Sequence, residues 1–361
     1  MTPTQAGELA GNKLSFGLLE EERRPTDYIH GQEERLGGSI WEKKQPVLEI
    51  NGEKVVTHEA DEPEHEFQRK AFETNACVSY SYDNCFEYLG EHECKKDPGF
   101  KLILASVGLI KNGKVNVSDR RTAKGSGTDP DAGNYVSKVD DYGRNFLFCP
   151  EDLYPYTETM GRAEYYQELP LEIANYGEKV KPLIKVETKY VSSNTVSTPD
   201  QLWDALQYSP IWASVDGFDQ RNADNIIEGF SGYTHRITIR KGVYGKYWEI
   251  HDHYQSQFKK YAWNYPFGNA KIMQLIILKK TPMEQLVKFG TQSAVYLQLA
   301  NGDLFGIADS QDITGGSLLK KFSGTYGNAG IVHLPIEDFD PKKVVGEIAA
   351  KRFSILSTIF N

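Results

Sequence analysis

Residues 74–90 read TNACVSYSYDNCFEYLG, and the apolar side chains in this stretch recur three or four positions apart. This spacing predicts one amphipathic helix that Gly90 ends. Thr74 and Asn75 are suitable N-cap residues, which places Cys77 in the first turn, where the helix dipole favours a negative charge. Cys77 is therefore a candidate nucleophile, and a small buried core residue is the alternative. The apolar positions are Val78, Tyr82, Cys85, Phe86 and Leu89.

The composition is that of a soluble globular protein. The chain has 361 residues, 39% of them hydrophobic and 25% charged, with a net charge of −9. This length allows two or three folded parts of about 150 residues each. The lysine pairs are scattered rather than gathered in a stripe, so we expect no nucleic-acid partner.

The N-terminal segment has no charged region followed by an apolar one, and no run of about 18 apolar residues occurs anywhere. We therefore expect neither a signal peptide nor a membrane span, and a cytoplasmic or virion-associated location. The four cysteines, Cys77, Cys85, Cys94 and Cys149, leave an odd number if Cys77 is a free thiol. This count does not suggest a disulfide framework, and it favours a reducing compartment.

The first 59 residues are rich in charge, Gly and Pro, and predict an extended arm with one small hairpin around Gly52. The acidic run at 59–66 is expected to be a solvated linker. The Gly-rich segment 125–134 lacks the Lys-Ser/Thr ending of a phosphate loop and the downstream Glu of a calcium loop. We expect a surface loop near the active cleft, without a metal or cofactor.

Further along, the sequence pattern predicts a short helix over 136–148 and a strand within 180–191. Thr198 to Gln201 form a capping box that opens a helix through Leu206, and residues 211–215 suggest a buried strand. The apolar run 101–109 could be a helix or a buried strand. Helices before about residue 165 and strands after it predict an α+β fold with two lobes and a ligand cleft between them.

Residues 234–254, THRITIRKGVYGKYWEIHDHY, alternate apolar and polar side chains on both sides of a Gly-containing turn, as a β-hairpin does. With Arg240 paired to Tyr247, His235 falls opposite Asp252 on the buried face. A buried His and carboxylate must satisfy each other, and the pairing orients the imidazole for base catalysis; a structural polar pair is the alternative.

His251 and His253 point to the other face of this hairpin. They could form half of a metal site, but no further ligands stand at a suitable spacing, so we expect exposed histidines and no bound metal.

These features resemble the papain-like cysteine peptidases over about residues 60–281. The resemblance rests on a Cys that begins a helix and on a distant His followed by the Trp248, Ile250, Asp252 and Tyr254 strand. It implies that Cys77 is the nucleophile, His235 the general base, and Asp252 the residue that orients His235, in a position usually held by Asn. Tyr254 matches an aromatic residue that shields the pair from water.

The chain departs from the family pattern in several places. The family's oxyanion glutamine lies closer to the cysteine than the nine positions that separate Gln68 from Cys77, yet Gln68 is the nearest candidate. The small residue that normally follows the histidine is Arg236. The chain is most similar to divergent members encoded by bacteria and bacteriophages, and the arm lacks the long helical pattern of the usual inhibitory prodomain.

Beyond residue 281 the pattern predicts a hairpin with a turn at Asn301–Gly302, and a helix that begins at Asp340–Pro341. The predicted organisation is listed by range: an arm (1–59), a papain-like domain (60–281) with a helical lobe (60–165) and a β lobe (166–281), and a C-terminal extension (282–361).

The sequence thus predicts a cysteine peptidase that acts on a peptide or protein through a thioester, with Cys77, His235, Asp252 and Gln68 at its site. The rival hypothesis is a structural or binding component, for example of a phage particle, on a papain-like scaffold with vestigial catalysis. The terminal segments could support self-association or virion assembly.

Overall fold

A computed structural model describes residues 17–21, 24, 27–32, 41–218, 220–254 and 258–278, together with the backbone of short strands between 286 and 334. The chain divides into two compact units. One comprises Met1–His92 and Lys114–Leu278, and the other comprises Glu93–Gly113 and Lys279–Asn361. The division predicted from the sequence stays a prediction.

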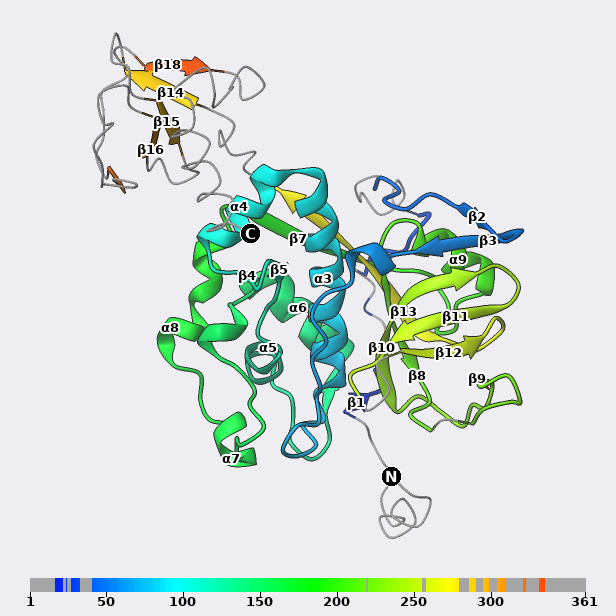
Figure 1. The fold of residues 1–361 in the computed structure, drawn as a ribbon. Coiled ribbons are helices and arrows are strands. Elements are labelled where there is room, and N and C mark those ends of the chain that lie inside the picture. The colour runs from blue at the N-terminus through cyan, green and yellow to red at the C-terminus, as the bar shows by residue number, and fades with distance from the viewer. Residues whose placement is uncertain are drawn as a thin grey trace. The chain divides into compact units, whose positions relative to one another are not determined.

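Helices and sheets occur together, which confirms the predicted α+β class (Figure 1). The helices are α3 (Cys77–Lys96), α4 (Pro98–Ser106), α5 (Asp119–Gly125), α6 (Val136–Phe146), α7 (Arg162–Tyr165), α8 (Leu171–Ala174) and α9 (Pro199–Leu206), with 3-10 turns at Glu59–Asp61, Glu151–Leu153 and Tyr176–Lys179. None of the helices in the described ranges is long and apolar enough to cross a membrane.

The described residues of the first unit form a nine-stranded, mostly antiparallel sheet in the order β7-β13-β8-β10-β11-β12-β9, with β3 beside β10 and β2 beside β3. Its strands are β2 (Leu48–Ile50), β3 (Glu53–Thr57), β7 (Ile184–Tyr190), β8 (Ile211–Val215), β9 (Ile226–Ile227), β10 (His235–Val243), β11 (Tyr247–His251), β12 (Phe258–Ala262) and β13 (Gly268–Ile277). The short strands β1 (Leu18–Leu19) and β6 (Asn134–Tyr135) pair in parallel.

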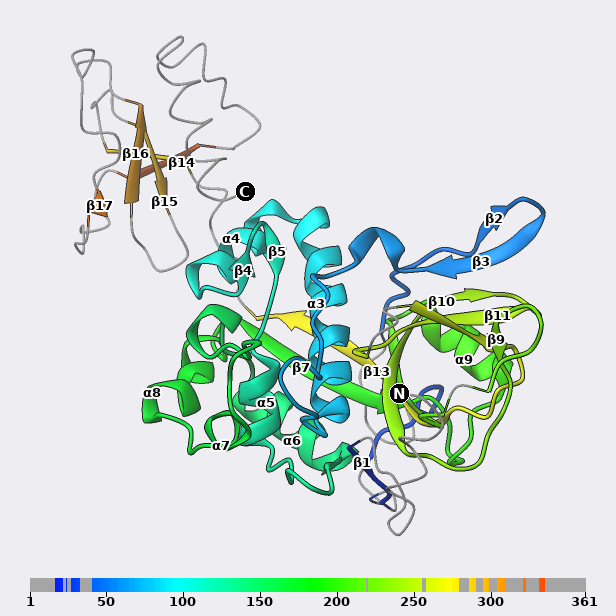
Figure 2. The same ribbon diagram turned by 60° about the horizontal axis from the view of Figure 1, so that its bottom comes forward.

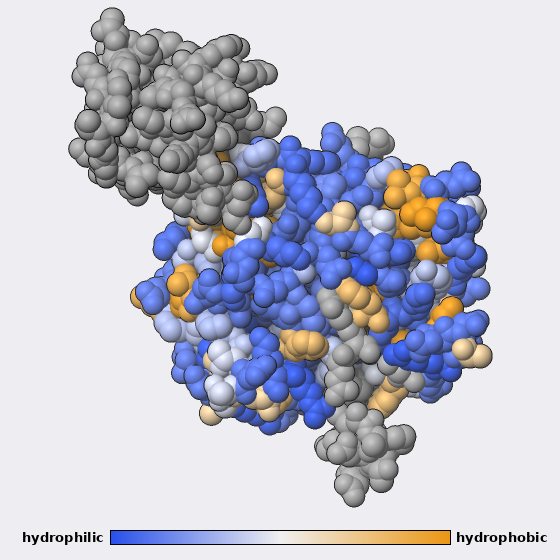
Figure 3. All heavy atoms as spheres, in the orientation of Figure 1, coloured by the Kyte–Doolittle hydropathy of each residue, from blue (hydrophilic) through white to orange (hydrophobic). Residues whose placement is uncertain are grey.

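The alternating residues of β8, β10 and β11 place their apolar side chains on one face of this sheet. Ile211, Ile237, Ile239 and Ile250 are fully buried there together with Leu202 of α9. Burying several such side chains stabilises the sheet by about 1.5–3 kcal/mol each. On the face in Figure 3 the described surface is mostly hydrophilic, in keeping with the net charge of −9.

Helix α3 lies between the sheet and α6, as Figures 1 and 2 show. The Thr238 hydroxyl of β10 donates to the Ser81 carbonyl on one side, and Gly143 of α6 packs on Tyr82 on the other. All residues from 76 to 90 are buried, so the predicted amphipathic character is wrong: a helix enclosed by both neighbours has no solvent face.

The predicted end of this helix at Gly90 is also wrong, because α3 continues to Lys96. At Gly90 a Cβ atom would lie 3.1 Å from the Val115 side chain, so the glycine allows close packing within the helix rather than ending it.

Several other predicted elements are confirmed. The arm contains the β2–β3 hairpin, the strand predicted within 180–191 is β7, and α9 opens with the capping box formed by Thr198 and Gln201. The ambiguous run 101–109 belongs largely to α4, a helix.

In the second unit, β15 (Val295–Gln298) pairs with β16 (Leu304–Ala308), as predicted, in a sheet that also contains β14 (Leu286–Phe289), β17 (Lys321–Phe322) and β18 (Ile331–Leu334). Strand β4 (Ile110–Lys111) of this unit follows α4 in the chain, whereas β5 (Lys114–Val115) belongs to the first unit. The helix predicted from Asp340 lies outside the described residues.

The β10–β11 hairpin forms, but with a different register from the one predicted. Ile239 pairs with Ile250 instead of Trp248, and the turn is shorter because Val243 pairs with Tyr247. Compared with the predicted pairing, the observed partners on β11 are shifted by three residues near the turn and by two residues beyond a bulge at Arg240. Since side chains alternate with period two, the even offset after the bulge keeps His235 and Asp252 on one face.

Candidate functional site

Cys77 is the first residue of α3, and its side chain is completely buried. The predicted N-cap side chains bind elsewhere: the Thr74 hydroxyl donates to the Gln68 carbonyl and the Asn75 amide to the Pro130 carbonyl. Asn75 also has a φ of +50°, a left-handed conformation that Asn tolerates. The loop containing Pro130 therefore lies beside the start of α3.

The Cys77 thiol contacts the strand that carries the candidate base. The backbone N–H of Arg236, the residue after His235, donates a hydrogen bond to it. Burial raises the pKa of the thiol, and this outweighs the lowering by Arg236, while Glu73 and Asp252 raise it further. The expected easily ionised thiol is therefore not found, because desolvation exceeds the effect of the helix terminus.

His235 and Asp252 form a buried pair. His235 Nε2 lies 2.8 Å from Asp252 Oδ1, and Nζ of Lys259 lies 2.8 Å from Asp252 Oδ2. Burial alone would raise the pKa of Asp252, but the charges of His235 and Lys259 outweigh it and hold the pKa well below the usual range. The Tyr254 ring packs edge-on against the imidazole at 5.0 Å between ring centroids.

Lys259 of β12 was not anticipated from the sequence. It pairs with Ile250 of the neighbouring strand β11, and only this tertiary pairing brings the ammonium to Asp252. Within the sequence FKKYA it is indistinguishable from Lys260, a surface residue.

Gln68 is fully buried, and its side chain is held by a second acid that the sequence analysis missed. The Gln68 amide donates to Glu73 Oε1 at 2.8 Å and to the Tyr254 hydroxyl at 2.9 Å, and that hydroxyl donates to Glu73 Oε2 at 2.7 Å. The charge of Glu73 also acts on Cys77. Gln68 thus belongs to the same cluster as Cys77 and Tyr254, through Glu73.

His251 and His253 are buried, so their expected exposure is wrong. His65 Nδ1 lies 2.7 Å from His251 Nε2, and the rings of His251 and His253 stack at 5.3 Å. Burial lowers the pKa values of His65 and His253 to about 4 and that of His251 well below its usual value. Within the described part of the chain, no group of His, Cys, Asp and Glu has an arrangement that could hold a metal ion.

The N-terminal arm crosses the start of α3. A Cβ atom on Gly17 would lie 2.1 Å from the Asn75 carbonyl oxygen, and the Gly17 carbonyl accepts a hydrogen bond from the Asn134 N–H. Glu21 lies four residues after Gly17, and its negative charge raises the pKa of Arg236. The arm therefore covers the backbone two residues before Cys77.

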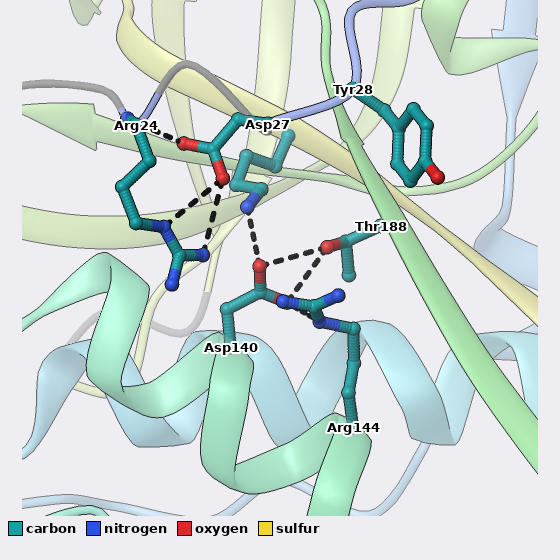
Figure 4. A pocket seen from close by; sticks show the side chains of 7 residues that line it. Arg24, Asp27, Tyr28, Asp140, Arg144 and Thr188 are labelled. Carbon is teal, nitrogen blue, oxygen red and sulfur yellow. Dashed lines mark hydrogen bonds and ion pairs between the residues drawn. The ribbon is translucent and has the colours of Figure 1, made fainter. Parts of the chain in front are cut away.

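A charged pocket of about 210 Å³ lies apart from these residues, where the arm meets α6, β7 and β13 (Figure 4). Its three cations pair with three carboxylates: Arg24 with Asp27 and Asp141, Arg144 with Asp140 and Asp141, and Lys271 with Asp140. Because these charges neutralise one another, the pocket anchors the arm and offers no net charge to a ligand.

No family model matches the chain, and no curated protein is similar to it in sequence. Solved structures with similar folds include bromelain from Ananas comosus, at 12% identity and a TM-score of 0.40 over 62% of this chain and 98% of that one. Xylellain, a cysteine protease from Xylella fastidiosa, matches at 12% identity and a TM-score of 0.45 over 72% of this chain and 96% of that one.

Proposed function

We propose that this chain is a cysteine peptidase with a papain-like two-lobe fold, in which Cys77 is the nucleophile, His235 the general base and Asp252 the residue that orients it. The proposal rests on the buried hydrogen bond of 2.8 Å between His235 and Asp252. The residue after His235, Arg236, donates its backbone N–H to the Cys77 thiol, so this pair and the thiol belong to one site. Since Asp252 engages Nε2, the other ring nitrogen, Nδ1, is the one that can exchange a proton with the thiol.

In the proposed reaction, the Cys77 proton moves to His235 Nδ1 and the sulfur attacks a peptide carbonyl carbon. The C–N bond breaks as His235 returns the proton to the leaving amine, which leaves a thioester. Water, deprotonated by His235, then attacks the thioester and releases the acid and the thiol. The Cys77 N–H would stabilise the oxyanion, joined by the Gln68 amide once it releases Glu73 or the Tyr254 hydroxyl, and the reaction needs no metal or cofactor.

One observation favours a second function. Cys77 is fully buried and the arm lies against Asn75, as expected if the chain is a binding or structural component, for example of a phage particle, with vestigial catalysis. The burial of Cys77 is equally consistent with a peptidase whose site becomes accessible only when the arm moves. Self-association or particle assembly through the terminal segments, in the cytoplasm or in a virion, belongs to this second proposal.

Cleavage of a peptide library by the full chain, beside Cys77→Ala, tests the peptidase. We expect cleavage and labelling by a thiol-reactive peptide electrophile in the parent chain only. Labelling that persists in Cys77→Ala would reject Cys77 as the nucleophile. Cys149→Ala, at another buried cysteine, is the matched control and should leave both signals unchanged.

A further inference from the structure

Arg236 is a fully buried arginine between the sheet and the start of α3. Its guanidinium donates to the Ser214 hydroxyl at 2.7 Å and to the carbonyls of Trp212 and Asn269 at 2.8 and 2.9 Å. It also lies over the Trp212 ring, 4.5 Å from the centroid. All of these partners are neutral.

A buried charge is expensive unless an opposite charge accompanies it. Among the residues that the structure describes, none places a carboxylate within ion-pair distance of Arg236. Burial lowers the pKa of Arg236 to about 10, so the side chain remains a cation at neutral pH. The fold thus holds a buried positive charge without an ion-pair partner on the residue that follows His235.

The groups whose charges act on Arg236 include Cys77, Cys85, Tyr190 and Glu21. Of these, Cys77 accepts a hydrogen bond from the backbone N–H of Arg236 itself. The other charges that act on the Cys77 thiol, Glu73 and Asp252, are negative and oppose its ionisation. Arg236 lies two residues before Thr238 on β10, so its side chain leaves the sheet on the same face as the Thr238 hydroxyl, which contacts Ser81 of α3.

We propose that the Arg236 guanidinium adds a second positive charge, besides the His235 imidazolium, that stabilises the Cys77 thiolate after its proton moves to His235. The inference rests on the function proposed above, with Cys77 as the nucleophile. Arg236 is a positioning residue in this scheme, since it acts on the sulfur and touches no substrate. A purely structural arginine, which only ties β8 to β13 through the Trp212 and Asn269 carbonyls, is the alternative.

The test compares alkylation of Cys77 by anionic iodoacetate and by neutral iodoacetamide, with the modified cysteine identified by mass spectrometry. The ratio of the two rates reports the charge beside the sulfur, because changes in access affect both small reagents alike. We expect Arg236→Met to lower the ratio at least about threefold, because the cation that attracts the anionic reagent is lost. Arg236→Lys should keep most of the parent ratio, because lysine retains the positive charge.

Ser214→Ala is the matched structural control, because it removes one hydrogen bond of Arg236 and keeps the charge. It should lower the urea concentration at which the chain unfolds and leave the ratio unchanged. An unchanged ratio in folded Arg236→Met would overturn the proposal.

If Arg236→Met does not fold, the NMR chemical shift of the Arg236 Nε–H group in the chain without substitutions provides the test. It should move more on carboxymethylation of Cys77, which adds a charge, than on carbamidomethylation, and equal shifts would contradict the proposal. Neither measurement requires peptide cleavage. If the chain cleaves no peptide but the alkylation ratio still depends on Arg236, the proposed peptidase activity is rejected and the electrostatic role of Arg236 is retained.

Discussion

His235 and Asp252 are joined by a contact of 2.8 Å although the hairpin register does not place them opposite each other. Extending the pairs Ile239–Ile250 and Thr238–His251 by one residue sets Asp252 level with Ile237. Asp252 follows the last residue of β11, so its carboxylate can reach diagonally to the imidazole while Lys259 holds its second oxygen. The pair is therefore made by three strands rather than two.

Removing the carboxylate should destabilise the fold as well as the site. In Asp252→Ala the half-buried Lys259 and the buried His235 lose their shared partner, and we expect a loss of about 3–5 kcal/mol in unfolding free energy, measured by urea denaturation. Asp224→Ala, at an exposed position, should change stability by less than about 0.5 kcal/mol. Equal effects of the two substitutions would show that the buried pair is not formed.

The arm should control access to Cys77. Gly17 has a φ of +100° and no room for a Cβ atom, so Gly17→Ala is expected to displace the arm from Asn75 and speed iodoacetamide labelling of Cys77 at least about tenfold. Gly31→Ala is the matched control, because Gly31 also has a positive φ, +76°, but nothing lies within 4 Å of the added atom. If both variants label at the parent rate, the arm does not protect the thiol.

Acidification should weaken the fold through the half-buried His65 and the buried His253. Burial lowers the pKa values of His65 and His253 to about 4, below the value near 6.5 of an unfolded chain. The stability contributed by their neutral forms is present above pH 6.5 and is lost as the pH falls towards 4, by up to about 1.4 kcal/mol per pH unit for each residue.

Urea denaturation of the parent chain and of His65→Gln between pH 7 and pH 4 tests this expectation. The variant should show a shallower decline, since it lacks one of the titrating groups. His58→Gln provides an independent check, because burial also lowers the pKa of His58 to about 4. Parallel declines in all three proteins would contradict the expectation.

The buried carboxyls of α3 and α5 should act in the opposite direction. Burial raises the pKa of Asp83 well above its usual range, and burial together with the charges of Glu66 and Asp83 does the same for Asp119. The folded state favours their protonated forms, so their contribution to stability is present at low pH and is lost as the pH rises above about 4.

Asp83→Asn should therefore be more stable than the parent chain at pH 8, and the difference should shrink towards pH 4. Thermal unfolding at both pH values measures it. Asp224→Asn, at an exposed position, should show no such dependence on pH. A destabilised Asp83→Asn at pH 8 would indicate that the ionised carboxylate is the favoured form.

The local elements could be predicted because their signals lie within one turn or one strand. The capping box at Thr198 and Gln201 and the β2–β3 hairpin follow from neighbouring residues. The register of β10 and β11 could not, because a bulge at Arg240 leaves no sequence signature. Gly90 misled the prediction for a similar reason, since its role is the close approach of Val115.

The sequence by itself determined the α+β class and nominated Cys77, His235 and Asp252, because apolar periodicity and the alternation of a hairpin are local properties. Only the tertiary structure decided the electrostatics around them. It brought Lys259 to Asp252, placed Glu73 and Arg236 beside Cys77, and laid Gly17 against Asn75. Such effects depend on burial and on distances between residues far apart in the chain, which periodicity does not encode.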